Sequence, residues 1–418
     1  MLWCHPGKGC IRVGFMSARR RGRCANCVLR SGSSCAIRPV TMCSSKNGIA
    51  RCGIKKPPVR VYADMNHSRT GARPPLEIAG HRIDAGRRLT IDIPAALLYT
   101  HAPVTLPVQV IHGRVAGPSL LVCAAIHGDE ISGVEIIRRL LSLPALKRLK
   151  GSLLAVPIVN VFGFAARSRY LPDRRDLNRA FPGSERGSLA ARMAHLFVRE
   201  ILVHASHVID LHTAAIHRDN LPQIRANLEE PSCLAMARAF GVPVTINAPL
   251  IEGSLRQLCN DTGKAVITYE AGEALRFNEA AIQAGVKGII RVLRHLGMIP
   301  SSRSSRSAPE SNYAANYSTW VRAEQDGIFR TAVALGAHVD KGRALGYIAD
   351  PFGERELTVE ASIDGIVVGR NNLPLVHEGE ALFHLARFDS VRRVAKYVAA
   401  FNRELEEDQG WQGEPPIV

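Results

Sequence analysis

Apolar runs of strand length alternate with amphipathic stretches of helical length through the middle of the chain. The runs are continuous and rich in Val, Ile and Leu, as in strands that are buried on both faces. This alternation predicts an α/β domain with a mostly parallel sheet flanked by helices. The predicted strands are 119–126, 151–160, 206–213 and 264–272, and the predicted helices between and after them are 127–143, 188–205 and 278–297.

The pattern changes after residue 299, so we place the α/β domain at 76–299. Residues 300–312 are rich in Ser, Pro and Arg and have the composition of a linker. Over 313–390 the helical spacing disappears, and short strand-like pieces recur between turn glycines in two similar halves. This predicts a small all-β barrel or sandwich domain, followed by a C-terminal tail, 391–418, that begins with helical spacing.

The first 75 residues form a basic, cysteine-rich segment. Residues 1–65 hold 13 Lys and Arg but one acid, and seven of the ten cysteines precede residue 53. We consider three interpretations: a disordered basic tail, sequence upstream of a true start at Met65, and an organelle transit peptide. Cys24 and Cys27 form a CxxC pair without a second pair at zinc-site spacing, so we predict no metal here.

Charge and hydropathy exclude some classes of function. Most of the net charge of +17 lies in the N-terminal segment, so the rest of the chain does not carry the basic surface typical of nucleic-acid binding. The sequence contains no apolar run of 18 residues, so we expect no membrane partner. Few cysteines occur beyond residue 52, which favours a reduced, cytoplasmic location, with organelle targeting left open. Nothing in the sequence indicates the oligomeric state.

Ligand-type side chains follow or end several predicted strands. His127 and Glu130 come directly after strand 119–126, and His212 lies near the end of strand 206–213. Ligands of open α/β sheets bind at the carboxyl ends of the strands. Two imidazoles and one carboxylate, with a fourth position left for water, are the ligands of a catalytic zinc ion. We therefore predict one Zn²⁺ per chain, held by these three residues.

Two further features carry possible chemistry. Glu270 ends strand 264–272, where a carboxylate beside an activated water could act as general base and then as general acid; Glu273 is the alternative. The loop 168–183 is dense in guanidinium groups, which suit a substrate carboxylate or a developing oxyanion. A solvated loop with no function is the competing interpretation.

The segments "HGDE", "DLNRAFPG", "DLHT" and "YEAG", in this order, resemble the succinylglutamate desuccinylase/aspartoacylase family, relatives of the zinc carboxypeptidases. The resemblance covers about residues 80–390. It implies a zinc-carboxypeptidase-like fold, with His127, Glu130 and His212 as zinc ligands and Glu270 as the catalytic acid/base. It also implies that Asn178 and Arg179 bind the α-carboxylate of the substrate. An upstream arginine would polarise the scissile carbonyl; Arg169 fits best, with Arg174 and Arg175 as alternatives.

The resemblance implies a zinc-dependent amidohydrolase that deacylates a small N-acyl amino acid. The acyl group and the amino acid are not indicated by the sequence. A carboxypeptidase acting on peptide C-termini would use the same metal chemistry and is the first alternative. Nucleic-acid binding through the basic N-terminus is the second, although we do not expect a nucleic-acid partner.

Overall fold

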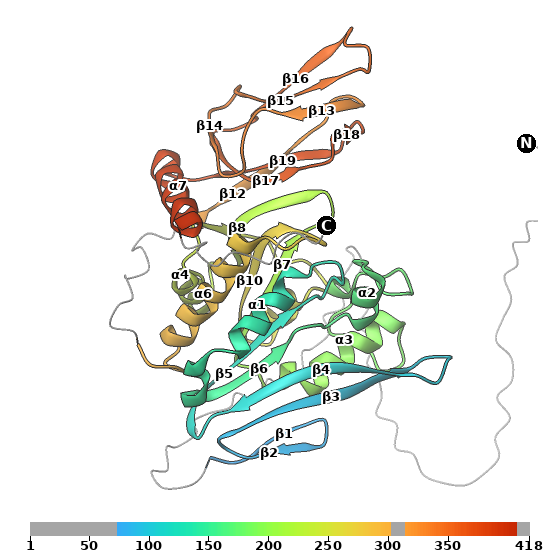
Figure 1. The fold of residues 1–418 in the computed structure, drawn as a ribbon, viewed down its shortest axis with the longest axis vertical. Coiled ribbons are helices and arrows are strands. Elements are labelled where there is room, and N and C mark those ends of the chain that lie inside the picture. Colours follow the sequence, from blue (N-terminus) through green and yellow to red (C-terminus); the bar gives the residue numbers. More distant parts are fainter. Residues whose placement is uncertain (1–72, 302–313, 408–418) are drawn as a thin grey trace, which may run out of the picture. The chain divides into compact units, whose positions relative to one another are not determined.

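A computed structural model describes residues 73–301 and 314–407 (Figure 1). These residues belong to one compact unit of the chain, Ser68–Val418. All but the last three residues of the basic segment predicted for 1–75, most of the predicted linker and the end of the C-terminal tail lie outside the described residues. No helix in the described ranges is long and apolar enough to cross a membrane.

A 13-stranded mixed sheet runs through this unit. Its longest path has the order β12-β19-β17-β8-β10-β7-β5-β6-β4-β3, while β9, β11 and β14 pair beside that path. In chain order the strands are β3 (Arg87–Leu97), β4 (Pro103–His112), β5 (Val115–Ala124), β6 (Lys150–Val156), β7 (His207–Ala214), β8 (Arg218–Ala226), β9 (Val244–Asn247), β10 (Ala265–Glu273), β11 (Ala314–Ala315), β12 (Tyr317–Arg322), β14 (His338–Val339), β17 (Gly365–Asn371) and β19 (Ala381–Arg387).

The prediction of a mostly parallel sheet is wrong, because the sheet is mixed: its centre is parallel, β9 pairs in parallel with β8 and β11 beside the main path, and the remaining pairs are antiparallel. Strands β6, β5, β7 and β10 pair in parallel, whereas β3, β4, β8, β17, β19 and β12 join the path through antiparallel pairs. Strand β8 begins so soon after β7 that no helix can be inserted between them. A parallel pair needs a long crossover, so β8 runs back antiparallel to β10 instead.

Helices cover both faces of the sheet (Figure 1). Several helices begin at a side-chain cap: Ser188, Ser254 and Asn278 each accept a hydrogen bond from a backbone N–H three residues on. The helices are α1 (Ser132–Leu141), α2 (Val161–Ala166), α3 (Leu189–Glu200), α4 (Pro231–Phe240), α5 (Leu255–Asp261), α6 (Glu279–His295) and α7 (Val391–Glu407), with short 3₁₀ turns η1 (Pro144–Arg148), η2 (Leu177–Arg179) and η3 (Leu202–His204).

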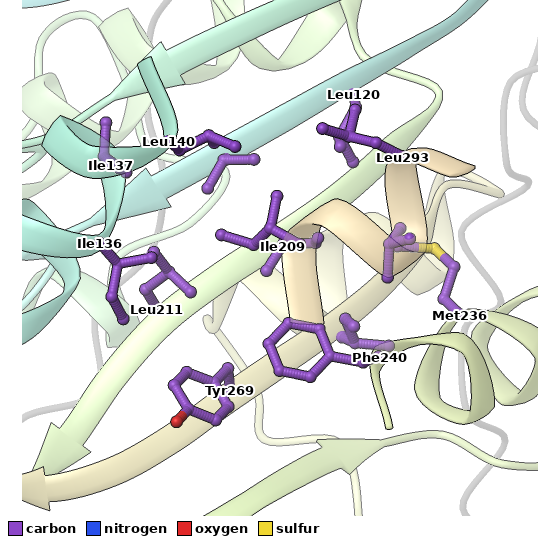
Figure 2. Close-up of a cluster of buried hydrophobic side chains, with 14 of the residues drawn as sticks. Leu120, Ile136, Ile137, Leu140, Ile209, Leu211, Met236, Phe240, Tyr269 and Leu293 are labelled. Carbon is purple, nitrogen blue, oxygen red and sulfur yellow. The ribbon is translucent and has the colours of Figure 1, made fainter. Parts of the chain in front are cut away.

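Two apolar clusters hold these layers together. One joins α1, α4 and α6 to one face of the sheet, and Figure 2 shows Tyr269 of β10 beside Phe240 of α4 within it. Helix α6 approaches closely because Gly288 faces the Phe240 ring, where a Cβ would lie 2.2 Å from a ring carbon. The other cluster packs α3, α5 and a small hairpin, β1 (Leu76–Ile78) with β2 (His81–Ile83), on the opposite face.

The predicted β-rich C-terminal region is present, and part of it belongs to the long sheet. Strands β12, β14, β17 and β19 are members of that sheet, and β17 pairs directly with β8. The other strands form an antiparallel sheet in the order β16-β15-β13-β18. An apolar cluster that includes Phe329 and Phe383 lies between the two layers. The strands of the smaller sheet are β13 (Gly327–Thr331), β15 (Ala344–Ala349), β16 (Glu356–Glu360) and β18 (Leu375–Val376).

Candidate metal centre

The three predicted ligands meet at the carboxyl ends of β5 and β7. Potential ligand atoms of His127, Glu130 and His212 all lie within 4.8 Å of one another. The Nδ1 atom of His127 is 2.6 Å from Glu130 Oε1, and the Nδ1 atom of His212 is 2.8 Å from Glu130 Oε2. All three side chains are buried. Two imidazole nitrogens and a carboxylate that converge in this way fit a zinc ion of the catalytic type.

A second layer of polar groups orients the two imidazoles. The Nε2 atom of His212 lies 2.8 Å from Asp210 Oδ2, and the Nε2 atom of His127 lies 3.2 Å from Asp176 Oδ1. These carboxylates occupy the Nε2 side of each ring, so both Nδ1 atoms point toward Glu130. Partners of this kind fix the tautomer and the basicity of metal-binding histidines. Asp210 precedes His212 by two residues on β7, whereas Asp176 belongs to the loop 168–183.

In the absence of a metal ion, the pKa values of the two histidines and Glu130 show how their charges are balanced. Burial alone would lower the pKa of His212, but the Asp210 and Glu130 carboxylates raise it well above the ordinary value. The pKa of His127 is also raised, against the effect of burial, chiefly by Glu130 and Asp176. The two imidazoles hold the pKa of Glu130 far below its usual range although the side chain is fully buried. A bound cation would take the place of the protons on these rings.

One pocket, with a volume of about 230 Å³, contains every site residue predicted from the sequence. These residues are His127, Glu130, His212, Glu270, Arg169, Asn178 and Arg179. Of the alternatives, Glu273, Arg174 and Arg175 are not part of the pocket wall. Glu273 instead accepts hydrogen bonds from the His217 backbone and the Asn372 side chain.

The arginine-rich loop supplies one wall of this pocket. Arg169 donates to Asp176 Oδ2 at 2.9 Å and to Glu130 Oε1 at 3.4 Å, so its guanidinium lies beside the His–Glu–His group. Asn178 accepts a hydrogen bond from the Leu255 backbone at the start of α5, which fixes the loop against that helix. The Arg179 guanidinium donates to the Asn178 carbonyl oxygen, and Arg179 is one of the residues that line the pocket.

Several pocket residues were not predicted. Asn220 and Arg225 come from β8 and contact the Glu270 carboxylate, at 2.8 Å from Asn220 Nδ2 and 3.5 Å from Arg225 Nε. Arg256 of α5 donates to the carbonyl oxygens of residues 248 and 249. Trp320 of β12 brings the C-terminal β region to the pocket wall. Strand β8 was not recognised in the sequence, so no local signal pointed to its side chains.

The fold and the site together define an α/β protein with a buried His–Glu–His group that can hold a metal ion. Residues 116–296 match the model of the succinylglutamate desuccinylase/aspartoacylase catalytic domain, which identifies this part of the chain as a member of that family.

Relatives of known name have similar sequences and structures. The chain is 26% identical over 294 residues to N-alpha-acetyl-L-2,4-diaminobutyric acid deacetylase of Halomonas elongata, covering 68% of this chain and 86% of the relative. It resembles the product-bound ectoine utilization protein EutE (DoeB) of Ruegeria pomeroyi, with a TM-score of 0.65, 26% identity, and 72% and 95% of the two chains covered. A succinylglutamate desuccinylase/aspartoacylase of Rhodobacter sphaeroides gives a TM-score of 0.66, 26% identity, and 73% and 98% coverage.

Proposed function

We propose that this protein is a zinc-dependent deacylase that hydrolyses the amide bond of a small N-acyl amino acid. The observation that carries the proposal is that the His127–Glu130–His212 group and Glu270 line the same pocket. The Halomonas relative is named for removing an acetyl group from an amino acid, which supports the same reaction class here. The volume of the pocket, about 230 Å³, suits a small substrate.

The chemistry divides among the residues of the pocket. Zinc held by the three ligands would acidify a bound water and polarise a carbonyl group. The Glu270 carboxylate takes a proton from the attacking water and returns it to the amide nitrogen as the C–N bond breaks. Water and amide thus become a carboxylate and a free amine.

Charged and polar groups on the loop position the substrate. Arg169 lies next to Glu130 and can donate to the carbonyl oxygen as negative charge develops there. Arg179 and Asn178 lie on the same wall and can bind the α-carboxylate, for which the planar guanidinium is well shaped.

The test combines metal analysis with a substrate panel. The purified protein is assayed for zinc and then for release of amine from N-acyl amino acids, with short peptides bearing free C-termini as the competing class. Glu270→Gln should keep the bound metal and the fold but lose at least about 100-fold in kcat, as expected for loss of a general acid/base. Glu273→Gln is the matched control, because that carboxylate contacts Asn372 outside the pocket wall, and it should retain turnover.

Two results would contradict the proposal. One is full activity of Glu270→Gln on an established substrate. The other is turnover that survives complete removal of the metal. Faster hydrolysis of peptides than of N-acyl amino acids would instead favour the carboxypeptidase alternative.

A further inference from the structure

The Glu270 carboxylate is held by side chains of β8, the strand that joins the catalytic residues to the C-terminal β region. The Asn220 amide donates to Glu270 Oε2 at 2.8 Å, and Arg225 Nε lies 3.5 Å from Glu270 Oε1. A carboxylate only accepts hydrogen bonds, so the NH₂ group of Asn220 must face it. Asn220 is 5% exposed and the Glu270 side chain is 16% exposed, so their bond is shielded from much of the surrounding water.

The position of Asn220 is set from both sides of β8. Asn220 is opposite Gly272 of β10 on one side and opposite Gly369 of β17 on the other. A Cβ added at Gly369 would lie 2.8 Å from Asn220 Oδ1 and 3.2 Å from His384 Cβ. A residue with a side chain at 369 would therefore push the Asn220 amide, or β17 itself, out of place. Only glycine leaves room for this close approach.

We propose that Asn220 is a positioning residue that aims the Glu270 carboxylate, and that Gly369 keeps Asn220 in place. Hydrolysis then depends on a contact made by a strand of the C-terminal β region. This inference rests on the proposed function, because it assigns Asn220 a role through Glu270. Proton transfer is sensitive to the position of the base, and a displacement of about 1 Å can cost about 100-fold in rate.

The first experiment measures kcat and KM for Asn220→Ala and Asn220→Asp in the full-length, metal-loaded protein. Both variants should lose about 10- to 100-fold in kcat, with KM changed by less than about threefold, because Asn220 acts on the base rather than on substrate affinity. Asn220→Asp is nearly isosteric and preserves packing, so it remains informative if the alanine variant does not fold.

Asn371 provides the matched control. It is a buried asparagine on β17, paired in register with Arg218 of β8, but its amide bonds within its own turn, to Leu373. Asn371→Ala should lose stability and keep kcat within about twofold of the wild type. Equal loss of kcat in Asn371→Ala and Asn220→Ala would overturn the proposal, as would an unchanged kcat in Asn220→Asp.

Gly369→Ala tests the contribution of the β region. Residue 369 is not part of the pocket wall, yet a folded Gly369→Ala protein should show the same kcat defect as Asn220→Ala with little change in KM. Wild-type kcat in that variant would show that β17 does not position Asn220.

A double-mutant cycle tests the contact without using activity. Unfolding is measured for Asn220→Ala, Glu270→Ala and the double variant. A hydrogen bond to a charged group should give a coupling of about tenfold or more in the unfolding equilibrium constant. If the effects of Asn220→Ala and Glu270→Ala on the unfolding free energy are additive, the proposal is overturned even if no substrate is found. Strong coupling in a protein that is inactive on the whole panel would refute the proposed function and leave the contact standing.

Discussion

The rings of His127 and His212 lie edge to face, with an interplanar angle of 62° and centroids 4.9 Å apart, and the Glu130 carboxylate bridges their Nδ1 atoms. Two imidazolium rings so close together would repel each other without that carboxylate and the two that bind the outer nitrogens. Proton binding, metal binding and the stability of the fold are therefore linked at this site.

Metal binding should release protons and should strengthen as the pH rises. The pKa values of both histidines are raised in the metal-free protein, so a metal must displace protons from the rings. Isothermal titration with Zn²⁺ at pH 6 and pH 8, in buffers of different ionisation enthalpy, measures both effects. Metal uptake without proton release at pH 6 would contradict this prediction.

The same shift predicts how the metal-free protein responds to pH. A histidine whose folded pKa lies above the ordinary 6.5 stabilises the fold fully below that value, and its contribution is lost as the pH rises through the raised pKa. Chelator-treated protein should therefore lose melting temperature on going from neutral to alkaline pH. The zinc-loaded protein should lose less, because the cation replaces the protons. The same change of melting temperature with pH in the two forms would contradict this prediction.

Replacing Arg169 with methionine should lower kcat/KM by about 100- to 1000-fold, the usual effect of removing one donor to a developing oxyanion. Arg169 also contacts Asp176, so zinc content must be measured in the same preparation. Arg175→Met is the control, because Arg175 is largely exposed and is not in the pocket wall. A larger defect in Arg175→Met than in Arg169→Met would transfer the role to Arg175.

His384 should make the protein less stable in mild acid. Burial, with a further effect of Arg225, lowers the pKa of His384 to about 3. Between pH 6.5 and 3 the unfolded chain binds this proton and the folded protein does not. The stabilisation that depends on neutral His384 is therefore complete above pH 6.5. As the pH decreases, the free energy of unfolding falls by up to about 1.4 kcal/mol per pH unit.

His384→Phe removes this proton site while keeping a flat ring against Trp320, on which His384 stacks with centroids 4.6 Å apart. Urea unfolding at pH 7.5 and pH 4.5 should show a smaller loss for the variant than for the wild type. Equal losses would mean that His384 does not set the acid sensitivity.

Gly288→Ala should destabilise the core although alanine is the better helix former by about 1 kcal/mol. Its Cβ would overlap the Phe240 ring, and overpacking of this kind costs about 1–3 kcal/mol. Phe240→Leu takes away the ring carbons Cε1 and Cζ and should reduce the overlap, so the double variant should be more stable than the sum of the single effects implies. Chemical denaturation of the four proteins measures the coupling, and strictly additive effects would count against it.

The predicted metal ligands lie where parallel strands end. His127, Glu130 and His212 follow or end β5 and β7, which pair in parallel, so their proximity follows from the sheet alone. Asp176 reaches His127 from a loop whose path depends on tertiary contacts, such as that of Asn178 with the start of α5. Strand periodicity carries no information about such a path.

The sequence pattern did not lead us to predict strand β8 or helix α4, for different reasons. The segment "RDNLPQIRA" of β8 contains charged residues and Pro222, which argue against a central strand; pairing with β10 and β17 overrides that local preference. Without β8, Asn220 and Arg225 could not be placed beside Glu270. Helix α4 did carry a signal, with Pro231 at its first position and Gly241 directly after its end.

The pairing of β17 with Arg218, Asp219 and Asn220 has a consequence for truncated proteins. A chain that stopped at residue 301 would keep all the proposed metal ligands and Glu270 but would leave the first half of β8 without a hydrogen-bonding neighbour on that side. Such an open strand is a template for association with other chains. The catalytic half expressed alone should therefore aggregate rather than yield a smaller working enzyme.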